Sequence, residues 1–263
     1  MNGRHQQIMN NMQVLHECWD SLLSLPNGDD DWKFAWVIIT NNATQDAINH
    51  RTTEAFAKQQ IAQLHWYHTF DMHKRAVVKY MDLIGKLEAQ HSGQMKHRHH
   101  RIPLMIGMLV AINQNFDVAA GIVNGSYGAL CRIRYFTDHE GHRYLKLCIV
   151  KIPGSDGVEV PHLPRHHFPI MLDMTELKFE HSKSHKHYTI RWKQVPIEPG
   201  FAITVYKVQW QTVNWVIVDF TGYTRTELPC VIVSKATSLD SLVVLHDFDA
   251  QQITKQCSED LRK

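Results

Sequence analysis

The stretch FAWVIITNNATQDAIN, Phe34 to Asn49, decides the fold class. It opens with an apolar, β-branched run that ends at Thr40, and such a run predicts a buried strand. Apolar residues then recur at helical spacing as far as Phe56, with Asn42 or Thr44 as the expected N-cap. A buried strand followed by a helix indicates an α/β layer.

The same character returns near the C-terminus, where FAITV (201–205), NWVIVDF (214–220) and LVVLHDF (242–248) predict three more strands. Between these regions, short β-rich runs are separated by turn signals such as Asn124-Gly125, which favours a small antiparallel barrel. We therefore expect a polar segment at 1–31 and an α/β domain at 32–100 and 196–263. A helix around 77–87 and a tail helix from 249 belong to this domain, and a β-barrel is inserted at 101–195.

Composition excludes few functions. The net charge is only +2, so global charge implies no partner. The five cysteines include no CxxC pair, which favours a reducing, intracellular compartment. No apolar run approaches the length of a membrane span, so we expect no membrane partner.

Three segments together resemble PIF-family DNA helicases of superfamily 1B. IPLMIGMLVAINQNFDVAAGIVNGSYGALCRI (102–133) resembles the opening of their inserted barrel. FAITVYKVQWQT (201–212) resembles their fifth helicase motif, and LPCVIVSKATSLDSL (228–242) resembles their sixth. Tyr206 and the lead-in IRWKQVPIEPGFA (190–202) look most like helicases of fungal Helitron transposons.

This resemblance implies the second RecA-like motor domain of a helicase, with an inserted barrel of the Src-homology-3 type at 101–195. The parent family unwinds DNA in the 5′-to-3′ direction, uses ATP and Mg²⁺, and binds single-stranded DNA. The resemblance also implies a role in DNA repair or recombination and a nuclear location.

Two elements of such a motor are missing from the sequence. It contains no GxxxxGK[ST] P-loop, and its one Gly-Lys pair, Gly85-Lys86, falls inside a predicted helix. It also lacks an apolar strand that ends in Asp-Glu to hold Mg²⁺. Because the family carries both elements on the first motor domain, we expect a truncated C-terminal half. Alone, it would bind no ATP or Mg²⁺ and would be inactive.

By the resemblance, Lys235 in VSKAT occupies the position of the catalytic arginine finger. Lysine keeps the positive charge but lacks the planar, two-pronged donor of arginine. An arginine finger contributes on the order of 10³–10⁵ in rate, and we expect lysine to recover only part of that.

Trp210 stands where the fifth motif of the family has glycine. A motif glycine permits close approach of the backbone to a ligand, which a tryptophan would block. The substitution indicates decay of the motif, or a ring that stacks on a nucleobase. The candidate DNA-binding residues that keep the family pattern are Thr204, Lys207, Gln209 and Thr212.

Three further candidates for DNA contact are the cations Lys96, Arg98 and Arg101, which could equally belong to a solvated linker. Asn124 and Gly125 are expected to shape a tight turn and to touch DNA only secondarily. We predict no metal site. The alternative function is a non-enzymatic module that binds single-stranded nucleic acid. A separate first motor domain supplied in trans is a third hypothesis.

Overall fold

The computed structural model describes residues 35–73, 76–77, 99–153, 155, 159–180, 187–208, 213–220 and 228–246. The segment predicted at 1–31, most of the helix predicted at 77–87 and the predicted tail helix lie outside these residues. The chain forms two compact units, which we call unit 1 (residues 1–49 and 201–263) and unit 2 (residues 50–200).

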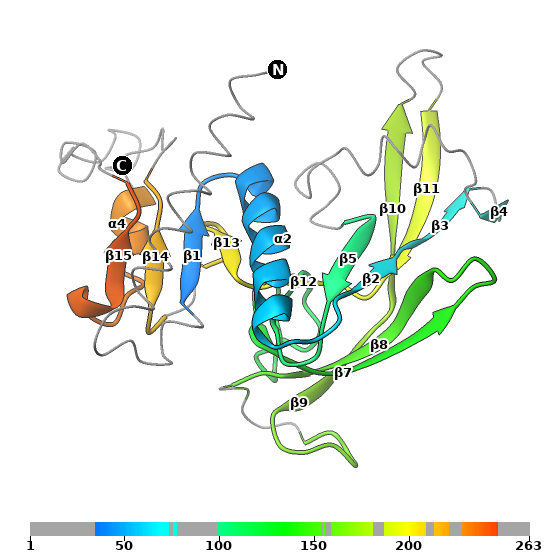
Figure 1. Cartoon of the computed structure of the whole chain (residues 1–263), viewed down its shortest axis with the longest axis horizontal. Coiled ribbons are helices and arrows are strands. Elements are labelled where there is room, and N and C mark those ends of the chain that lie inside the picture. The colour runs from blue at the N-terminus through cyan, green and yellow to red at the C-terminus, as the bar shows by residue number, and fades with distance from the viewer. Residues whose placement is uncertain are drawn as a thin grey trace. The chain divides into compact units, whose positions relative to one another are not determined.

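Unit 1 is built on a parallel sheet with the strand order β13-β1-β14-β15 (Figure 1). The strands are β1 (Trp36–Ile39), β13 (Ala202–Thr204), β14 (Val216–Val218) and β15 (Leu242–Val244). All four fall within the predicted strand segments. Their β-branched residues are buried almost throughout, as expected for a parallel sheet whose two faces are both covered.

Helix α2 (Asn42–Gln59) follows β1 as predicted. The predicted N-cap is wrong by one residue, because the Thr44 N–H donates to Oδ1 of Asn41 at 2.8 Å. Ile48 of the helix packs in one core cluster with Val37 and Ile217. The remaining elements of unit 1 are α4 (Leu228–Val233) and a 3₁₀ turn at Leu239–Ser241.

A buried side chain fixes α2 to the edge strand of this sheet. Asn49 is 4% exposed, and its Oδ1 accepts from the Ala202 N–H at 2.7 Å. Its Nδ2 donates to the Ala202 carbonyl at 3.1 Å. One amide thus satisfies both backbone groups of the residue that opens β13, and the position of β13 depends on it.

Unit 2 consists of two sheets. The larger has the path β12-β6-β7-β8-β2-β5, with β9 also paired to β8. Its strands are β2 (His65–His68), β5 (Arg101–Leu104), β6 (Leu109–Ile112), β7 (Tyr127–Thr137), β8 (Arg143–Lys151), β9 (His167–Met171) and β12 (Ile197–Pro199). The smaller sheet has the order β10-β11-β3-β4, from β3 (Phe70–His73), β4 (Ala76–Val77), β10 (Asp173–Glu180) and β11 (His187–Gln194).

The limits of unit 2 differ from those predicted for the inserted barrel. Unit 2 runs from His50 to Gly200, whereas the barrel was predicted at 101–195, and the predicted domain limits stay a prediction. The cause is strand pairing: β2 pairs with β5 and β8, and β3 pairs with β11. Because β2 runs parallel to β8, the larger sheet is mixed rather than purely antiparallel. The Src-homology-3 type of this unit stays a prediction.

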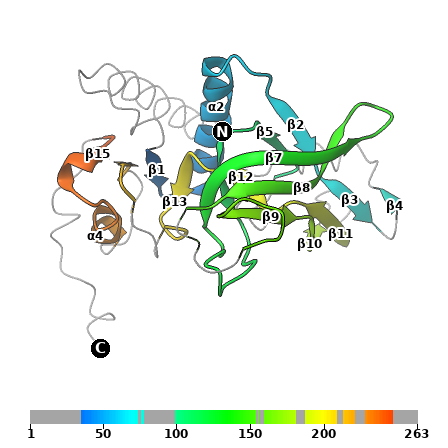
Figure 2. The ribbon, with the colours of Figure 1, turned by 90° about the horizontal axis from the view of Figure 1, so that it is seen from below.

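The hairpin of β7 and β8 is the longest feature of unit 2, and β9 extends it on one side (Figure 2). Gly128 in β7 approaches β8 very closely. A Cβ at this position would lie 2.6 Å from Cγ1 of Val150 and closer still to the carbonyl oxygen of Lys151. Gly128 lies within a strand, where the ladder leaves no room for a side chain.

Among the residues that the structure describes, no helix has the length and apolar character needed to cross a membrane.

Candidate functional site

The four strands of unit 1 end together at one edge of the sheet, which we call the carboxyl edge. The Val205 N–H donates to the Ile39 carbonyl at 3.2 Å, and the Asp219 N–H donates to the Ile38 carbonyl at 3.1 Å. The Leu245 N–H donates to the carbonyl at the end of β14 at 2.8 Å. In open α/β sheets, ligands bind outside this edge, so it is the first place to look for a site.

Thr204 and Lys207, two of the predicted DNA-binding residues, share one turn at the carboxyl edge. The Lys207 N–H donates to the Thr204 carbonyl at 3.0 Å. Thr204 is buried at 4% exposure and anchors the turn, whereas Lys207 is half-buried. Tyr206 between them is 56% exposed. The turn therefore presents an aromatic ring next to a cation.

Tyr206 was missing from the predicted site residues, although it lies within the segment 201–212 that resembles the fifth helicase motif. An exposed tyrosine beside a lysine can stack on a base while the ammonium group meets a phosphate. The adjacency of Tyr206 and Lys207 was the signal that could have identified it.

Asp219 follows β14 at the same edge. Its carboxylate contacts the imidazole of His246, with Oδ1 and Nδ1 3.2 Å apart. Asp219 is only 4% exposed. A buried carboxylate bound to a histidine is not an open ligand for Mg²⁺, which keeps several of its waters when it binds to proteins.

Lys235 lies near the opposite end of the strands. Its carbonyl accepts from the Val213 N–H at 2.8 Å, and Val213 precedes the first residue of β14. Thr204 comes at the end of β13, and the strands are parallel. Lys235 therefore lies near the edge where strands begin, and the described residues do not bring it together with Thr204 and Lys207.

The predicted residues of unit 2 that the structure describes, Asn124, Gly125 and Arg101, have structural partners. Gly125 has a φ of +94°, and its N–H donates to the Ile112 carbonyl at 2.8 Å, so the Asn124-Gly125 pair shapes a turn as expected. Asn124 is exposed and donates its N–H to Oδ1 of Asn115 at 2.8 Å. The guanidinium of Arg101 lies over the Trp66 ring, 4.8 Å from its centroid.

The remaining predicted site residues, Lys96, Arg98, Gln209, Trp210 and Thr212, lie outside the described residues, so their roles stay predictions.

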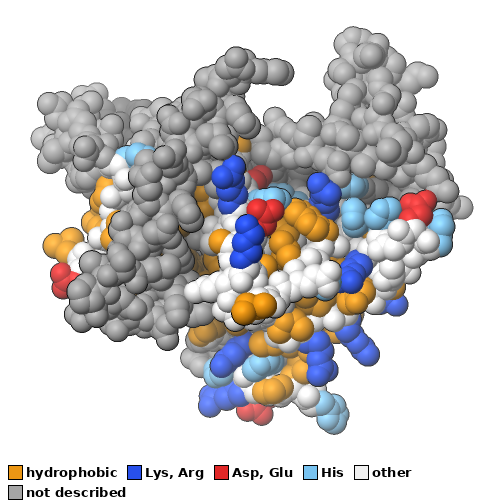
Figure 3. Space-filling model, in the orientation of Figure 1, with side chains coloured by type: hydrophobic (Ala, Val, Ile, Leu, Met, Phe, Trp, Pro, Cys, Tyr) orange, Lys and Arg blue, Asp and Glu red, His pale blue; other side chains and the backbone are white. Residues whose placement is uncertain are grey.

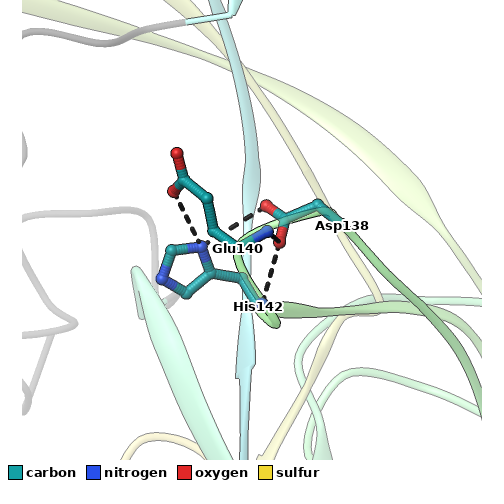
Figure 4. A group of neighbouring side chains, drawn as sticks. All are labelled: Asp138, Glu140 and His142. Carbon is teal, nitrogen blue, oxygen red and sulfur yellow. Dashed lines mark hydrogen bonds and ion pairs between the residues drawn. The ribbon is translucent and has the colours of Figure 1, made fainter.

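Asp138, Glu140 and His142 meet at the tip of the β7–β8 hairpin (Figure 4). Nδ1 of His142 lies 3.3 Å from Asp138 and 3.4 Å from Glu140. Oδ1 of Asp138 also accepts from the N–H groups of Glu140 and His142, at 3.0 and 2.9 Å. These bonds close the hairpin turn, so the cluster has a structural explanation without a metal ion.

The hydrogen bonds at this tip shift the titration of Asp138. Desolvation raises the pKa of its carboxyl, but donation from the backbone of His142, the Tyr144 hydroxyl and the backbone of Glu140 outweighs it. The pKa of Asp138 is therefore lower than its ordinary value.

No family model matches the chain, and no curated protein matches it either. Solved structures do match. Pif1 helicase from Candida albicans aligns with a TM-score of 0.55 and 16% identity, over 98% of this chain and 56% of that one. Bacteroides Pif1 in complex with ADP-AlF3 and ssDNA aligns at 0.54 and 15%, over 94% and 49%. Bacteroides Pif1 bound to ssDNA aligns at 0.53 and 15%, over 97% and 52%.

At these identities the likeness concerns the fold, which is the RecA-like α/β fold that occurs in Pif1 helicases. The chain spans about half the length of these structures.

Proposed function

We propose that this chain is the second motor half of a PIF-type DNA helicase and that its carboxyl edge binds single-stranded DNA. The observation that carries the proposal is the fold shared with Candida albicans Pif1 helicase over 98% of this chain. Two of the Bacteroides structures contain single-stranded DNA. The exposed Tyr206 and the half-buried Lys207 supply the stacking ring and the cation that such a ligand requires.

In this proposal the chain alone does not hydrolyse ATP. We expect the chain alone to bind no ATP or Mg²⁺, because the sequence has no P-loop and Asp219 is buried against His246. A first motor domain would supply the P-loop and the Mg²⁺-binding carboxylates. With that partner, Lys235 would stand in for the arginine finger.

Four finer parts of the proposal rest on the sequence resemblance. They are the Helitron origin, the degenerate state of the motifs at Trp210 and Lys235, a nuclear role in repair or recombination, and the Src-homology-3 type of unit 2. Each is consistent with a helicase fold and needs its own test.

Fluorescence anisotropy with a labelled oligo(dT) strand tests the DNA-binding part. We expect salt-sensitive binding by the full chain, and a loss of about 1–3 kcal/mol in binding free energy for Tyr206→Ala, the cost of one stacked base. Tyr135→Ala is the control, an exposed tyrosine in unit 2. Equal losses in both variants, or no binding at low salt, would contradict the assignment of DNA to the carboxyl edge.

An ATPase assay separates the two candidate functions. A non-enzymatic nucleic-acid module is favoured by the exposed Tyr206–Lys207 turn together with the absence of a P-loop in the sequence. Such a module would bind DNA but stay inactive when a PIF-type first motor domain is added in trans. DNA-stimulated hydrolysis that appears only in the mixture, and is lost in Lys235→Ala, would support the motor assignment.

A further inference from the structure

The β7–β8–β9 face of unit 2 carries an open groove of about 690 Å³ that the proposed function does not use. Its lining is Ile133, Arg134 and Tyr135 from β7, Lys146 and Leu147 from β8, and Met171 from β9. In Figure 3, Lys and Arg side chains gather with hydrophobic ones over the lower part of the view, where Figure 1 shows β7, β8 and β9.

Strand register explains how these side chains come to one face. Arg134 pairs directly with Leu147, and Leu147 pairs directly with Met171, so the three form a row across three strands. The register then shifts, because Tyr135 pairs with Leu145 rather than with Lys146. Lys146 is thus the extra residue of a β-bulge. A bulge changes the direction in which the side chain of the extra residue points.

The floor of the groove is apolar and exposed. Met171 is 61% exposed and Tyr135 is 43% exposed. Contiguous exposed apolar side chains with a polar rim mark protein–protein contact sites. Methionine suits such a surface because its flexible thioether adapts to different partners.

The rim is basic. The described carboxylates form no ion pair with Arg134 or Lys146, and the ammonium group of Lys146 lies 5.3 Å from the centroid of the Phe136 ring. Two cations beside an apolar floor complement a partner that carries both carboxylates and apolar side chains.

A nucleic-acid strand fits this groove less well. Single strands bind to exposed aromatic faces. Among the described residues of the lining Tyr135 is the only aromatic one, and the Arg143 guanidinium lies over its ring, 5.1 Å from the centroid. Most of the floor is aliphatic or thioether, which packs against apolar side chains.

We propose that the β7–β8–β9 groove binds an acidic, amphipathic segment of a partner protein. The apolar side chains of the segment cover Met171, Leu147 and Tyr135, and its carboxylates meet Arg134 and Lys146. This site lies in unit 2 and is independent of the carboxyl edge of unit 1.

A displayed library of short random peptides, selected on the full chain, tests the proposal. We expect enrichment of peptides that combine Asp or Glu with Leu, Ile or Phe. The best peptide should bind about ten-fold more weakly to Met171→Ser and to Lys146→Glu, as for the loss of a contact residue. Ile106→Ser and Lys151→Glu are matched controls outside the groove, since Ile106 is 60% exposed and Lys151 lies on the same strand as Lys146.

The controls should leave binding unchanged, and thermal unfolding should show that all four variants are folded. Enrichment of basic peptides, no enrichment, or equal effects of the groove and control substitutions would overturn the proposal. A further result would also overturn it: an oligo(dT) strand displaces the peptide and itself binds more weakly to Met171→Ser and Lys146→Glu. The groove would then be a nucleic-acid site.

Discussion

The parallel sheet of unit 1 and the β7–β8 hairpin of unit 2 achieve close packing in opposite ways. In unit 1 a side chain, Asn49, satisfies both backbone groups of Ala202 at the edge of the sheet. In unit 2 the absence of a side chain at Gly128 lets Lys151 and Val150 approach β7. The first arrangement fails when an atom is removed, and the second fails when an atom is added.

Gly128→Ala should destabilise the β7–β8 hairpin, and it has the largest expected effect. The added methyl would meet the backbone carbonyl of Lys151 and Cγ1 of Val150, so we expect unit 2 to lose about 3 kcal/mol or more of unfolding free energy. Gly107→Ala is the control: its φ is +91° but nothing lies within 4 Å, so only backbone strain of about 1–2 kcal/mol applies. Denaturant unfolding followed by circular dichroism measures both. Similar losses would contradict the role assigned to close approach at Gly128.

Asn49→Ala should destabilise the sheet of unit 1 at its edge strand β13. It leaves a buried N–H and a buried carbonyl of Ala202 without their partner, and we expect a loss of about 2–4 kcal/mol in unfolding free energy. Asn115→Ala removes a comparable acceptor from the N–H of Asn124, but at an exposed site where water can replace it. Unfolding of both variants by denaturant should therefore give a much smaller loss for Asn115→Ala. A loss below about 1 kcal/mol for Asn49→Ala would contradict the role assigned to its two hydrogen bonds with Ala202.

Ile61→Gly tests whether removal of a side chain can stabilise the chain, here at the C-terminal end of α2. The Ile61 N–H donates to Lys58 and the Ala62 N–H donates to Ala57, which is the Schellman pattern that ends α2. Ile61 has a φ of +50° and is 96% exposed, so a β-branched residue stands where glycine is preferred. We expect a gain of about 1 kcal/mol in thermal unfolding experiments. Gln60→Gly, one residue earlier, should give no gain.

The Asp138 turn should give the smallest effect and one that depends on pH. Because the pKa of Asp138 in the folded chain is below its ordinary value of 3.8, its stabilisation is present above that value. It is lost as the pH falls through the lower, folded-state pKa. Asp138→Asn should therefore destabilise the chain slightly at pH 6 and leave stability unchanged at pH 2. Unfolding at both pH values, with Asp240→Asn as control, checks this. A loss that is equal at both pH values would contradict it.

Local pattern predicted the strands of unit 1 well. The strands at Trp36–Ile39 and Val216–Val218 are dense β-branched runs, and their burial on both faces makes the signal independent of partners. The N-cap was less certain because Asn41, Asn42 and Thr44 are all good caps. Only the backbone geometry selects among them.

Contacts between distant residues were beyond prediction. Residues His65–His68 carry no clear alternating pattern, and they become a strand because they pair with Arg101–Leu104 and with β8. The partner of Asp219, His246, is 27 residues away. The resemblance to the fifth motif selected Lys207 as a DNA-binding candidate, but the sequence gave no indication that Lys235 lies near the opposite end of the strands.

The most direct test of the central claim is the salt dependence of single-stranded DNA binding by the full chain, with Lys207→Ala and Lys151→Ala side by side. The claim is that the Thr204–Lys207 turn meets DNA phosphates. It predicts that Lys207→Ala reduces the magnitude of the slope of log affinity against log salt concentration by about one, the contribution of one phosphate contact. Lys151→Ala should leave this slope unchanged. Equal slopes for the parent chain and Lys207→Ala would contradict the claim.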